Sequence, residues 1–556
     1  MERTLRIFEP ATRATSFAAA PVRWLFDGQA GPGDRFLARW IFLRVLAAIY
    51  FSAFYSLLFQ IEGLSGPNGV LPAQQLLRAL KGMSALRYWY APTLFWLSSG
   101  SHMILAVVLV GMAASITAIC NLWPRFSLLV CFACFLSFVS AAQAFSSYQS
   151  DGMLLEAGFI SLFFAPRGIR PGWGTASPPS RASLFLLQWE WFRIYFESGL
   201  VKLLSHDPEW RDFTAMDDYY QNGPLPTWIG YYVAHLPHWF HAATVAGTLA
   251  MELAIVWMLF LPRRARLICF CIVTPWEIGV ILTANYTFLN YLVLALGFLL
   301  LDDGGVKWLI PQRFLSVLRN AAPRATELSS APRNVITATD VVAAIPQWHL
   351  WFRTFRISIS ALMLTWVAYA TTAEMIAMPF PNLPFPSLPI VALEPFRTAN
   401  QYGLFARMTR GRYEIEFQGS NDGNSWTPYP FRYKPQALNK APGIYAPYQP
   451  RFEWNLWFAS LSDWRQSDFV PLTEERLLEN DGDVLRLFRS NPFVHAPPRY
   501  VRSVLWQYWF TSMDEKRQSG NWWRRELIGL YAPELTRLQD GQFTVVEWPQ
   551  ELPPHD

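Results

Sequence analysis

Residues 186–204 read LLQWEWFRIYFESGLVKLL, an apolar run that carries four ionisable side chains: Glu190, Arg193, Glu197 and Lys202. The first three are spaced at i, i+3 and i+7, which places them on one face of a helix. An ionisable group in a membrane span costs about 2.5–3.5 kcal/mol to insert, so such groups usually face a protein interior. We therefore predict a membrane helix with a buried polar face. Salt bridges that hold a bundle together and a functional site both fit this spacing.

The rest of the chain has the composition of a membrane protein. Of its 556 residues, 52% are hydrophobic and 16% are charged, whereas about a quarter of a typical soluble domain is charged. We predict a polytopic α-helical membrane bundle of about eight to nine spans. Two short segments, 152–166 and 286–301, could be re-entrant or tilted. The apolar segments are 38–60, 101–121, 126–148, 152–166, 183–204, 240–262, 266–284, 286–301 and 354–378.

Basic residues predict the orientation of the bundle. Five arginines precede the first apolar segment, and arginine recurs in alternate loops, with the loop 61–100 as an exception. By the positive-inside rule the N-terminus is cytoplasmic and the C-terminus lies outside. The outside is the periplasm if the membrane is a bacterial inner membrane, or the lumen if it is the endoplasmic reticulum. The predicted parts are a cytoplasmic segment 1–37, a bundle 38–301 with an outer loop 205–238, a cytoplasmic connection 302–353, a last transmembrane helix 354–378 and an exported domain 379–556.

The exported part changes character after a proline-rich lead-out. GRYEIEFQGS (411–420) alternates like a half-buried strand, and TPYPFRYKP (427–435) is predicted to return as its partner. TEERLLENDGDVLRLFRSNPF (473–493) indicates one or two helices, and VRSVLWQYWFTS (501–512) another strand. We predict a soluble, mainly β domain with short helices. Its many tryptophans favour a packed core over an exposed apolar patch, although both are open.

Two further groups of residues are candidate binding sites. An aromatic and charged cluster near the C-terminus has the residue types enriched where partners bind, although packing into the domain core explains it equally. The outer loop is acidic and carries several histidines, which are more typical of hydrogen-bonded rim residues than of a metal site. The outer-loop candidates are Asp207, Trp210, Arg211 and Asp217, and the C-terminal candidates are Trp522, Trp523, Arg524, Arg525 and Glu526.

Motifs for common enzymatic chemistry are absent from the sequence. It has no G-x-S-x-G nucleophile elbow, no H-E-x-x-H and no P-loop. We expect neither a metal nor a cofactor. No basic run stands out, so nucleic acid is not an expected partner.

Many pieces of the chain together resemble the lipase maturation factor family. They occur in one order from end to end: SLLFQIEGLSGPNGVLPA (56–73), ESGLVKLLSHDPEWRDFTAMDDYY (197–220), LPHWFH (236–241), LTANYTFLNYLVL (282–294), NQYGLFARMT (400–409), IEFQGSNDGNSW (415–426), FRYKP (431–435), APYQPRFEWNLWFASL (446–461), NPFVHAPPRYVR (491–502) and NWWRRELIGLY (521–531). The resemblance implies a multi-pass membrane protein of the secretory pathway that helps secreted lipases fold or assemble. Its expected partners are the lipid bilayer and exported client proteins, lipases among them.

A shorter resemblance points to a second class of function. FESGLVKLLSHDPEW (196–210) is similar to the region around the catalytic base of vitamin K-dependent gamma-carboxylases, and Lys202 would be that base. A lysine in a low-dielectric pocket can lose its proton and act as a base. Ionisable side chains that are paired in a filled core would favour an assembly factor. In that case we expect residues 379–556 to bind the clients. A roomy pocket with an unpaired Lys202 would favour the enzyme.

Overall fold

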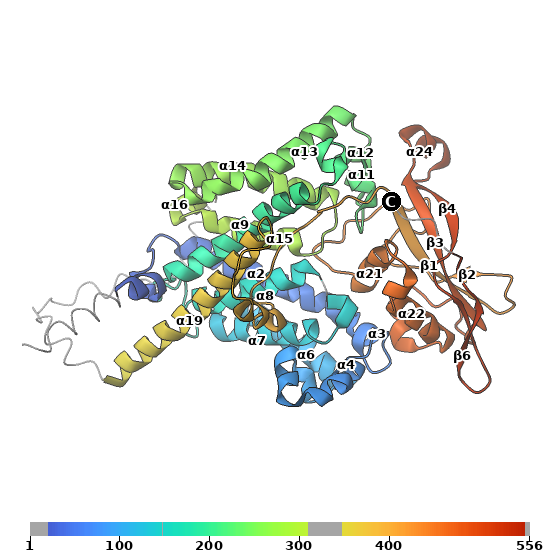
Figure 1. Cartoon of the computed structure of the whole chain (residues 1–556), viewed down its shortest axis with the longest axis horizontal. Helices are drawn as coiled ribbons and strands as arrows, with labels where there is room; N and C mark the ends of the chain where they lie inside the picture. The colour runs from blue at the N-terminus through green and yellow to red at the C-terminus, as the bar shows by residue number, and fades with distance from the viewer. Residues whose placement is uncertain (1–19, 147, 310–346, 551–556) are drawn as a thin grey trace, which may run out of the picture.

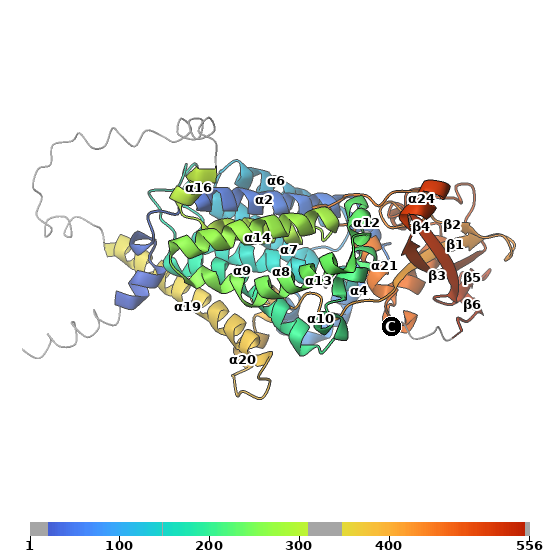
Figure 2. The ribbon, with the colours of Figure 1, turned by 90° about the horizontal axis from the view of Figure 1, so that it is seen from above.

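The computed structural model describes residues 20–146, 148–309 and 347–550. A helical part is followed by a C-terminal domain that combines a sheet with short helices, and Figures 1 and 2 place the sheet at one end of the elongated bundle. Most of the predicted cytoplasmic connection 302–353, and the first part of the segment 1–37, lie outside the described residues.

Five helical spans in the described residues are long and apolar enough to cross a membrane. They are Phe36–Leu58 (α2), Ser101–Ile119 (α6), His238–Phe260 (α13 and η5), Arg263–Thr283 (α14) and Trp351–Ala377 (within α19). The pair Leu289–Leu300 and Asp303–Leu309, bent by 119°, makes a sixth if it is one span. The expected eight to nine spans are therefore not confirmed.

The apolar segments that do not qualify as spans are short or charged. Helix α7 (Pro124–Val139) and helix α8 (Gln149–Phe164) each have 16 residues, about 24 Å at a rise of roughly 1.5 Å per residue. Helix α9 (Arg181–Leu204) has 24 residues but carries the four ionisable side chains described above. Both α8 and α9 are largely buried by other helices, which is how a membrane protein accommodates polar side chains.

The remaining helices of the first part are short. They are η1 (Gly28–Ala30), α3 (Ile61–Ser65), α4 (Ala73–Leu80), η2 (Lys81–Leu86), α5 (Arg87–Tyr90), η3 (Leu94–Trp96), η4 (Gln143–Ser146), α10 (Pro208–Arg211), α11 (Ala215–Asn222), α12 (Trp228–Ala234), α15 (Leu289–Gly297), η6 (Phe298–Leu300) and α16 (Asp303–Leu309). Helix α19 as a whole runs from Gln347 to Ala377.

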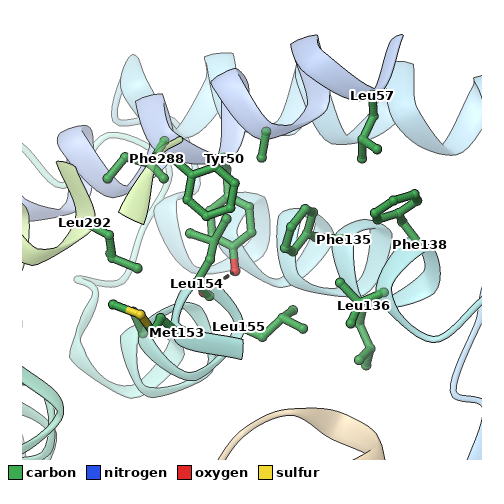
Figure 3. Close-up of a cluster of buried hydrophobic side chains, with 14 of the residues drawn as sticks. Tyr50, Leu57, Phe135, Leu136, Phe138, Met153, Leu154, Leu155, Phe288 and Leu292 are labelled. Carbon is green, nitrogen blue, oxygen red and sulfur yellow. Dashed lines mark hydrogen bonds between the residues drawn. The ribbon is translucent and has the colours of Figure 1, made fainter. Parts of the chain in front are cut away.

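Helix α2 packs against α6, α7, α8 and α15, and Figure 3 shows buried side chains near α2, from Phe135 to Leu292, in one cluster. The Tyr50 hydroxyl donates a hydrogen bond to the Leu154 carbonyl at 2.9 Å, and its ring meets Phe135 edge-on at 5.9 Å. Gly158 allows this contact, because a Cβ there would lie 2.0 Å from the Tyr50 hydroxyl oxygen. Close approach at a glycine thus fixes how α2 and α8 pack.

The C-terminal domain contains one antiparallel sheet in the order β2-β1-β3-β5-β6, with β4 also paired to β3. Ile415 in β1 lies opposite Leu505 in β3, and both are fully buried. The predicted strands at 411–420 and 501–512 are confirmed. The strands are β1 (Arg412–Ser420), β2 (Thr427–Pro428), β3 (Tyr500–Phe510), β4 (Trp523–Leu530), β5 (Glu534–Arg537) and β6 (Phe543–Glu547).

The prediction that 427–435 forms a full partner strand is wrong. Only Thr427 and Pro428 pair with β1. The prolines of this segment lack the N–H that a strand interior needs. The Tyr429 N–H still donates to the Phe417 carbonyl of β1 at 2.9 Å. Beyond it the chain leaves the sheet, and the N–H groups of residues 432–434 donate to the buried Glu453 carboxylate at 2.9, 2.8 and 2.6 Å.

Short helices cover the sheet, as the sequence predicts for 473–493. Helix α21 lies between the sheet and the bundle (Figure 1), packing against both β1 and η4. The C-terminal helices are α20 (Leu388–Val391), η8 (Glu394–Phe396), α21 (Arg451–Ala459), η9 (Trp464–Gln466), α22 (Phe469–Leu478), α23 (Gly482–Leu485) and α24 (Met513–Ser519).

Candidate functional site

The polar face of α9 is buried, as its spacing predicts. Glu190, Arg193 and Glu197 are 0% exposed, and Lys202 is 2% exposed. The Arg193 guanidinium lies 3.8 Å from the Glu197 carboxylate on the next turn. It also forms an ion pair with Glu156 of α8, a partner that the sequence analysis missed. Arg193 is thus held between two acids from two helices.

The third partner of this face is a segment that leads into the C-terminal domain. We name residues 397–409, which precede β1, the strap. The Asn400 carbonyl accepts a hydrogen bond from Arg193 Nη1 at 2.6 Å, while Asn400 N and Nδ2 each donate to Glu156 Oε2 at 3.1 Å. The strap therefore adds hydrogen bonds to a buried charged pair whose two members both lie in the bundle.

Tyr402 extends the same network along the strap. Its hydroxyl donates to Glu156 Oε2 at 2.9 Å, and its backbone N–H donates to Glu197 Oε2 at 2.6 Å. The guanidinium of Arg193 also lies over the Tyr402 ring, with its central carbon 4.9 Å from the ring centroid. NQYGLFARMT and ESGLVKLLSHDPEW, two separate pieces of the resemblance, thus meet in space.

Lys202 makes an ion pair with a different helix. Its Nζ lies 2.9 Å from both carboxylate oxygens of Glu252 in α13. It also donates to the carbonyls of Ser198 and of Leu404 in the strap, at 3.3 and 3.2 Å. Because the ammonium is surrounded by acceptors, it is not the unpaired amine that the carboxylase alternative needs.

Glu190 and Glu277 are two further acids in the apolar helices near this network. Glu190 forms no ion pair with any described residue. Glu277 of α14 accepts hydrogen bonds from the Tyr195 hydroxyl at 2.6 Å and from Asn290 Nδ2 at 2.5 Å. Glu277 thus joins α14 to α9 and α15 by hydrogen bonds.

Arg451 of α21 makes a second charged link between the two parts. Its two terminal nitrogens each lie 2.7 Å from one oxygen of Asp151 in α8, and Nη1 also donates to the Phe145 carbonyl at 2.9 Å. Both side chains are 0% exposed. The sequence analysis named neither residue.

A cavity of about 1350 Å³ adjoins Lys202 and lies between the bundle and the C-terminal domain. Its lining includes Lys202 and Glu252 of the bundle, Phe405 of the strap and Trp454 of α21. The ions are therefore paired, as expected for an assembly factor, yet the space beside them is not filled. The assembly-factor hypothesis predicted the paired charges, and the enzyme hypothesis predicted the open cavity.

The outer-loop candidates hold the strap and the rim of the bundle. Asp207 accepts from Met408 N at 2.7 Å, and the Trp210 indole donates to the Phe405 carbonyl at 3.0 Å. Arg211 contacts His206. Asp217 pairs with His238 at 2.9 Å. No group of three metal-ligating side chains was found among the described residues.

The C-terminal candidates differ widely in exposure. Trp523 is 1% exposed, and its ring centroid lies 4.6 Å from that of Phe510. Arg525 pairs with Glu416 at 3.3 Å. Arg524 and Glu526 point outward from β4 and are exposed. These last two are the members that a partner can reach directly.

Trp522 connects the C-terminal domain to the outer loop. Its ring packs edge-on against Tyr231 of α12 with centroids 4.9 Å apart. Lys516 Nζ lies 3.3 Å from the Trp522 centroid, and the Tyr231 hydroxyl donates to the Thr511 carbonyl at 2.9 Å. This contact, like the strap and Arg451, fixes the domain against the bundle.

Comparisons with known proteins cover both parts of the chain. The lipase maturation factor transmembrane domain matches residues 37–308, and the lipase maturation factor C-terminal domain matches residues 398–533. Lipase maturation factor 2 of Gallus gallus is 32% identical over 90% of this chain and 81% of its own length, and that of Homo sapiens is 30% identical over 90% and 83%. Lipase maturation factor 1 of Bos taurus is 28% identical over 94% and 93%. No solved structure gave a significant match.

Proposed function

This chain belongs to the lipase maturation factor family, and from that premise we propose that it assists the folding or assembly of exported proteins, lipases among them. The match to both domains of the family carries the proposal. Nothing in the comparisons favours the carboxylase alternative, and the pairing of Lys202 with Glu252 counts against it despite the open cavity beside them. We propose that this multi-pass membrane protein acts without catalysing a reaction.

The rigid attachment of the two parts supports a scaffolding role. Two buried ion-pair networks, around Arg193 and around Arg451, use groups from both the bundle and the C-terminal part. Breaking a buried pair by removing one partner costs about 3–5 kcal/mol. The C-terminal domain is therefore presented to clients in one orientation, which we place on the exported side of the membrane.

The proposal is tested in cells that lack their own maturation factor. A secreted lipase is expressed with and without this chain, and its specific activity in the medium is measured beside that of an unrelated secreted protein. We expect the chain to raise the lipase activity alone. No gain in activity at normal chain expression would overturn the proposed function.

A paired substitution separates the assembly factor from the enzyme. Lys202→Met with Glu252→Gln removes the charges together, which avoids leaving one buried ion unpaired. The assembly-factor proposal predicts that this double variant keeps most of the lipase maturation. Complete loss from a stably folded double variant would instead point to chemistry at Lys202.

A further inference from the structure

The cavity beside Lys202 has a size that ion pairing does not explain. Its volume of about 1350 Å³ exceeds the roughly 300–1,000 Å³ of pockets that hold drug-sized ligands. Much of its wall is apolar or aromatic, including Met251, Trp276, Trp454 and Phe458. A space of this kind fits a ligand with long hydrocarbon parts.

The position of the cavity points to the bilayer as the source of that ligand. One wall is formed by Thr244, Thr248 and Met251 of α13 together with Ile272 and Trp276 of α14. Both helices belong to the candidate membrane spans. Gly247 leaves room for the Trp276 ring between them, since a Cβ there would lie 3.0 Å from that ring. A lipid entering between α13 and α14 thus meets one aromatic side chain.

The charges around the cavity indicate an uncharged ligand. Lys202 is neutralised by Glu252, with both oxygens at 2.9 Å. The Glu277 carboxylate already accepts hydrogen bonds from Tyr195 and Asn290. The other charged side chains of the lining, Arg407 and Asp468, are exposed to solvent. A charged head group beside Lys202 and Glu277 would therefore lie without a free counter-ion, which is costly in a low-dielectric site.

Two buried hydrogen-bond donors line the cavity. Asn455 lies beside the Tyr148 hydroxyl and Tyr286 beside that of Tyr219, but among the described residues neither contact gives Asn455 Nδ2 or the Tyr286 hydroxyl a hydrogen bond of normal distance and angle. Asn455 is 5% exposed and Tyr286 is 7% exposed. A buried donor without a well-formed hydrogen bond is unfavourable, so a carbonyl or ester oxygen of a ligand would satisfy these two donors.

We propose that this cavity binds an uncharged, ester-bearing membrane lipid of the diacylglycerol type, which enters between α13 and α14. The acyl chains occupy the apolar walls, and ester oxygens accept from Asn455 and Tyr286. This binding site goes beyond the proposed function, because it does not depend on which client the protein assists.

The first test uses the full chain in phosphatidylcholine nanodiscs that contain a small fraction of diacylglycerol with a photoreactive acyl chain. After irradiation, labelled peptides are mapped. We expect labelling at the cavity wall formed by 454–458, in addition to 244–251. A photoreactive phosphatidylcholine should label lipid-facing helix surfaces but not 454–458. Diacylglycerol labelling confined to exposed faces, such as Leu109 and Ile116 of α6, would overturn the proposal.

A matched pair of variants tests the cavity itself. Thr248 lines the cavity and its hydroxyl bonds only within its own helix, to the Thr244 carbonyl at 2.9 Å. Thr248→Phe should reduce labelling of 454–458 by about tenfold, whereas Ala250→Phe on the exposed side of α13 should leave it unchanged. Equal labelling in both variants would contradict the site.

Competition on the unmodified protein covers the case in which Thr248→Phe does not fold. Unlabelled diacylglycerol should displace the photoreactive analogue from 454–458, and phosphatidylcholine should not. A polypeptide crosslinked at 454–458 that diacylglycerol does not displace would show that the cavity holds a client segment, and would overturn the lipid assignment.

Discussion

Arg451 of α21 and Asp151 of α8 form a two-point ion pair across 300 positions of the chain, with both nitrogen–oxygen distances at 2.7 Å. Neither side chain is exposed. A charge at this depth is tolerated only while its partner is present. The pair therefore makes correct folding of the helical bundle depend on the C-terminal domain.

We expect Arg451→Leu to destabilise the protein by about 3–5 kcal/mol, because Asp151 is left buried and uncompensated. The melting temperature in detergent measures the effect. Arg517→Leu is the control, since that arginine is 77% exposed and pairs at the surface. Asp151→Leu combined with Arg451→Leu should recover part of the loss. Equal melting temperatures for Arg451→Leu and Arg517→Leu would contradict the linkage.

Asn400→Ala should release the strap from the bundle. The variant loses the side-chain hydrogen bonds to Glu156 and to the Gly152 carbonyl, both at 3.1 Å, and leaving buried acceptors unsatisfied costs about 1–3 kcal/mol. Faster cleavage by trypsin after Arg397 or Arg407 is the expected readout. Gln401→Ala, one residue away, loses only an exposed hydrogen bond to the Glu374 carbonyl at 3.3 Å and should be cleaved at a rate closer to that of the parent. Identical cleavage of both variants would argue against a held strap.

The sequence predicted the buried face of α9 but not its partners. Spacing within one helix shows which side chains share a face, whereas no rule of spacing connects Arg193 to Glu156 or Asn400. The acids themselves were detectable: Glu156, Glu252 and Glu277 all lie in apolar segments. The insertion cost of a buried carboxylate therefore indicates these three acids, but it does not indicate Asn400 or Tyr402.

The expected eight to nine spans are not confirmed for a related reason. Hydropathy alone does not distinguish a helix surrounded by lipid from one surrounded by protein, and α8 belongs largely to the second kind. The strap also changes the expectation that residues 379–556 act as a separable unit. Deleting them would remove Asn400, Tyr402 and Arg451 from acids buried in the bundle. Surface substitutions are therefore the sharper test of client handling.

Glu474 of α22 should make the stability of the C-terminal domain depend on pH. Burial raises the pKa of this carboxyl well above its ordinary value of 4.5. As pH rises from the ordinary to the raised pKa, the unfolded chain loses its proton while the folded chain keeps it, so the free energy of unfolding falls. Glu474→Gln removes this titration. Its melting temperature relative to the parent should increase from about pH 5 to about pH 8.

Glu515 provides a comparison of opposite sign. Hydrogen bonds from Ser512 lower the pKa of Glu515. Its contribution to stability is present above the ordinary pKa and is lost as pH falls through the lowered one. Glu515→Gln should therefore lose stability relative to the parent as pH rises. A pH-independent difference for Glu474→Gln would show that its titration is not linked to folding.

Single cysteines test the orientation of the chain. Asn421→Cys lies in the turn after β1, and Lys307→Cys lies on the exposed side of α16, both in a background without native cysteines. The positive-inside pattern predicts that a membrane-impermeant thiol reagent labels position 421 but not 307 in intact cells or sealed right-side-out vesicles. The reverse pattern would place the C-terminal domain in the cytoplasm.

Arg524→Ala separates a partner contact from a structural role in the C-terminal cluster. Arg524 is exposed on β4, with its guanidinium 5.2 Å from the Trp509 ring centroid, and exposed arginines beside aromatic rings are frequent contributors to binding. We expect lipase maturation to fall at unchanged folded yield. Arg525→Ala is the structural counterpart, because it breaks the pair with the buried Glu416 and should lower yield and maturation together. A joint fall in yield and maturation for Arg524→Ala would show that it, too, supports the fold rather than contacting a client.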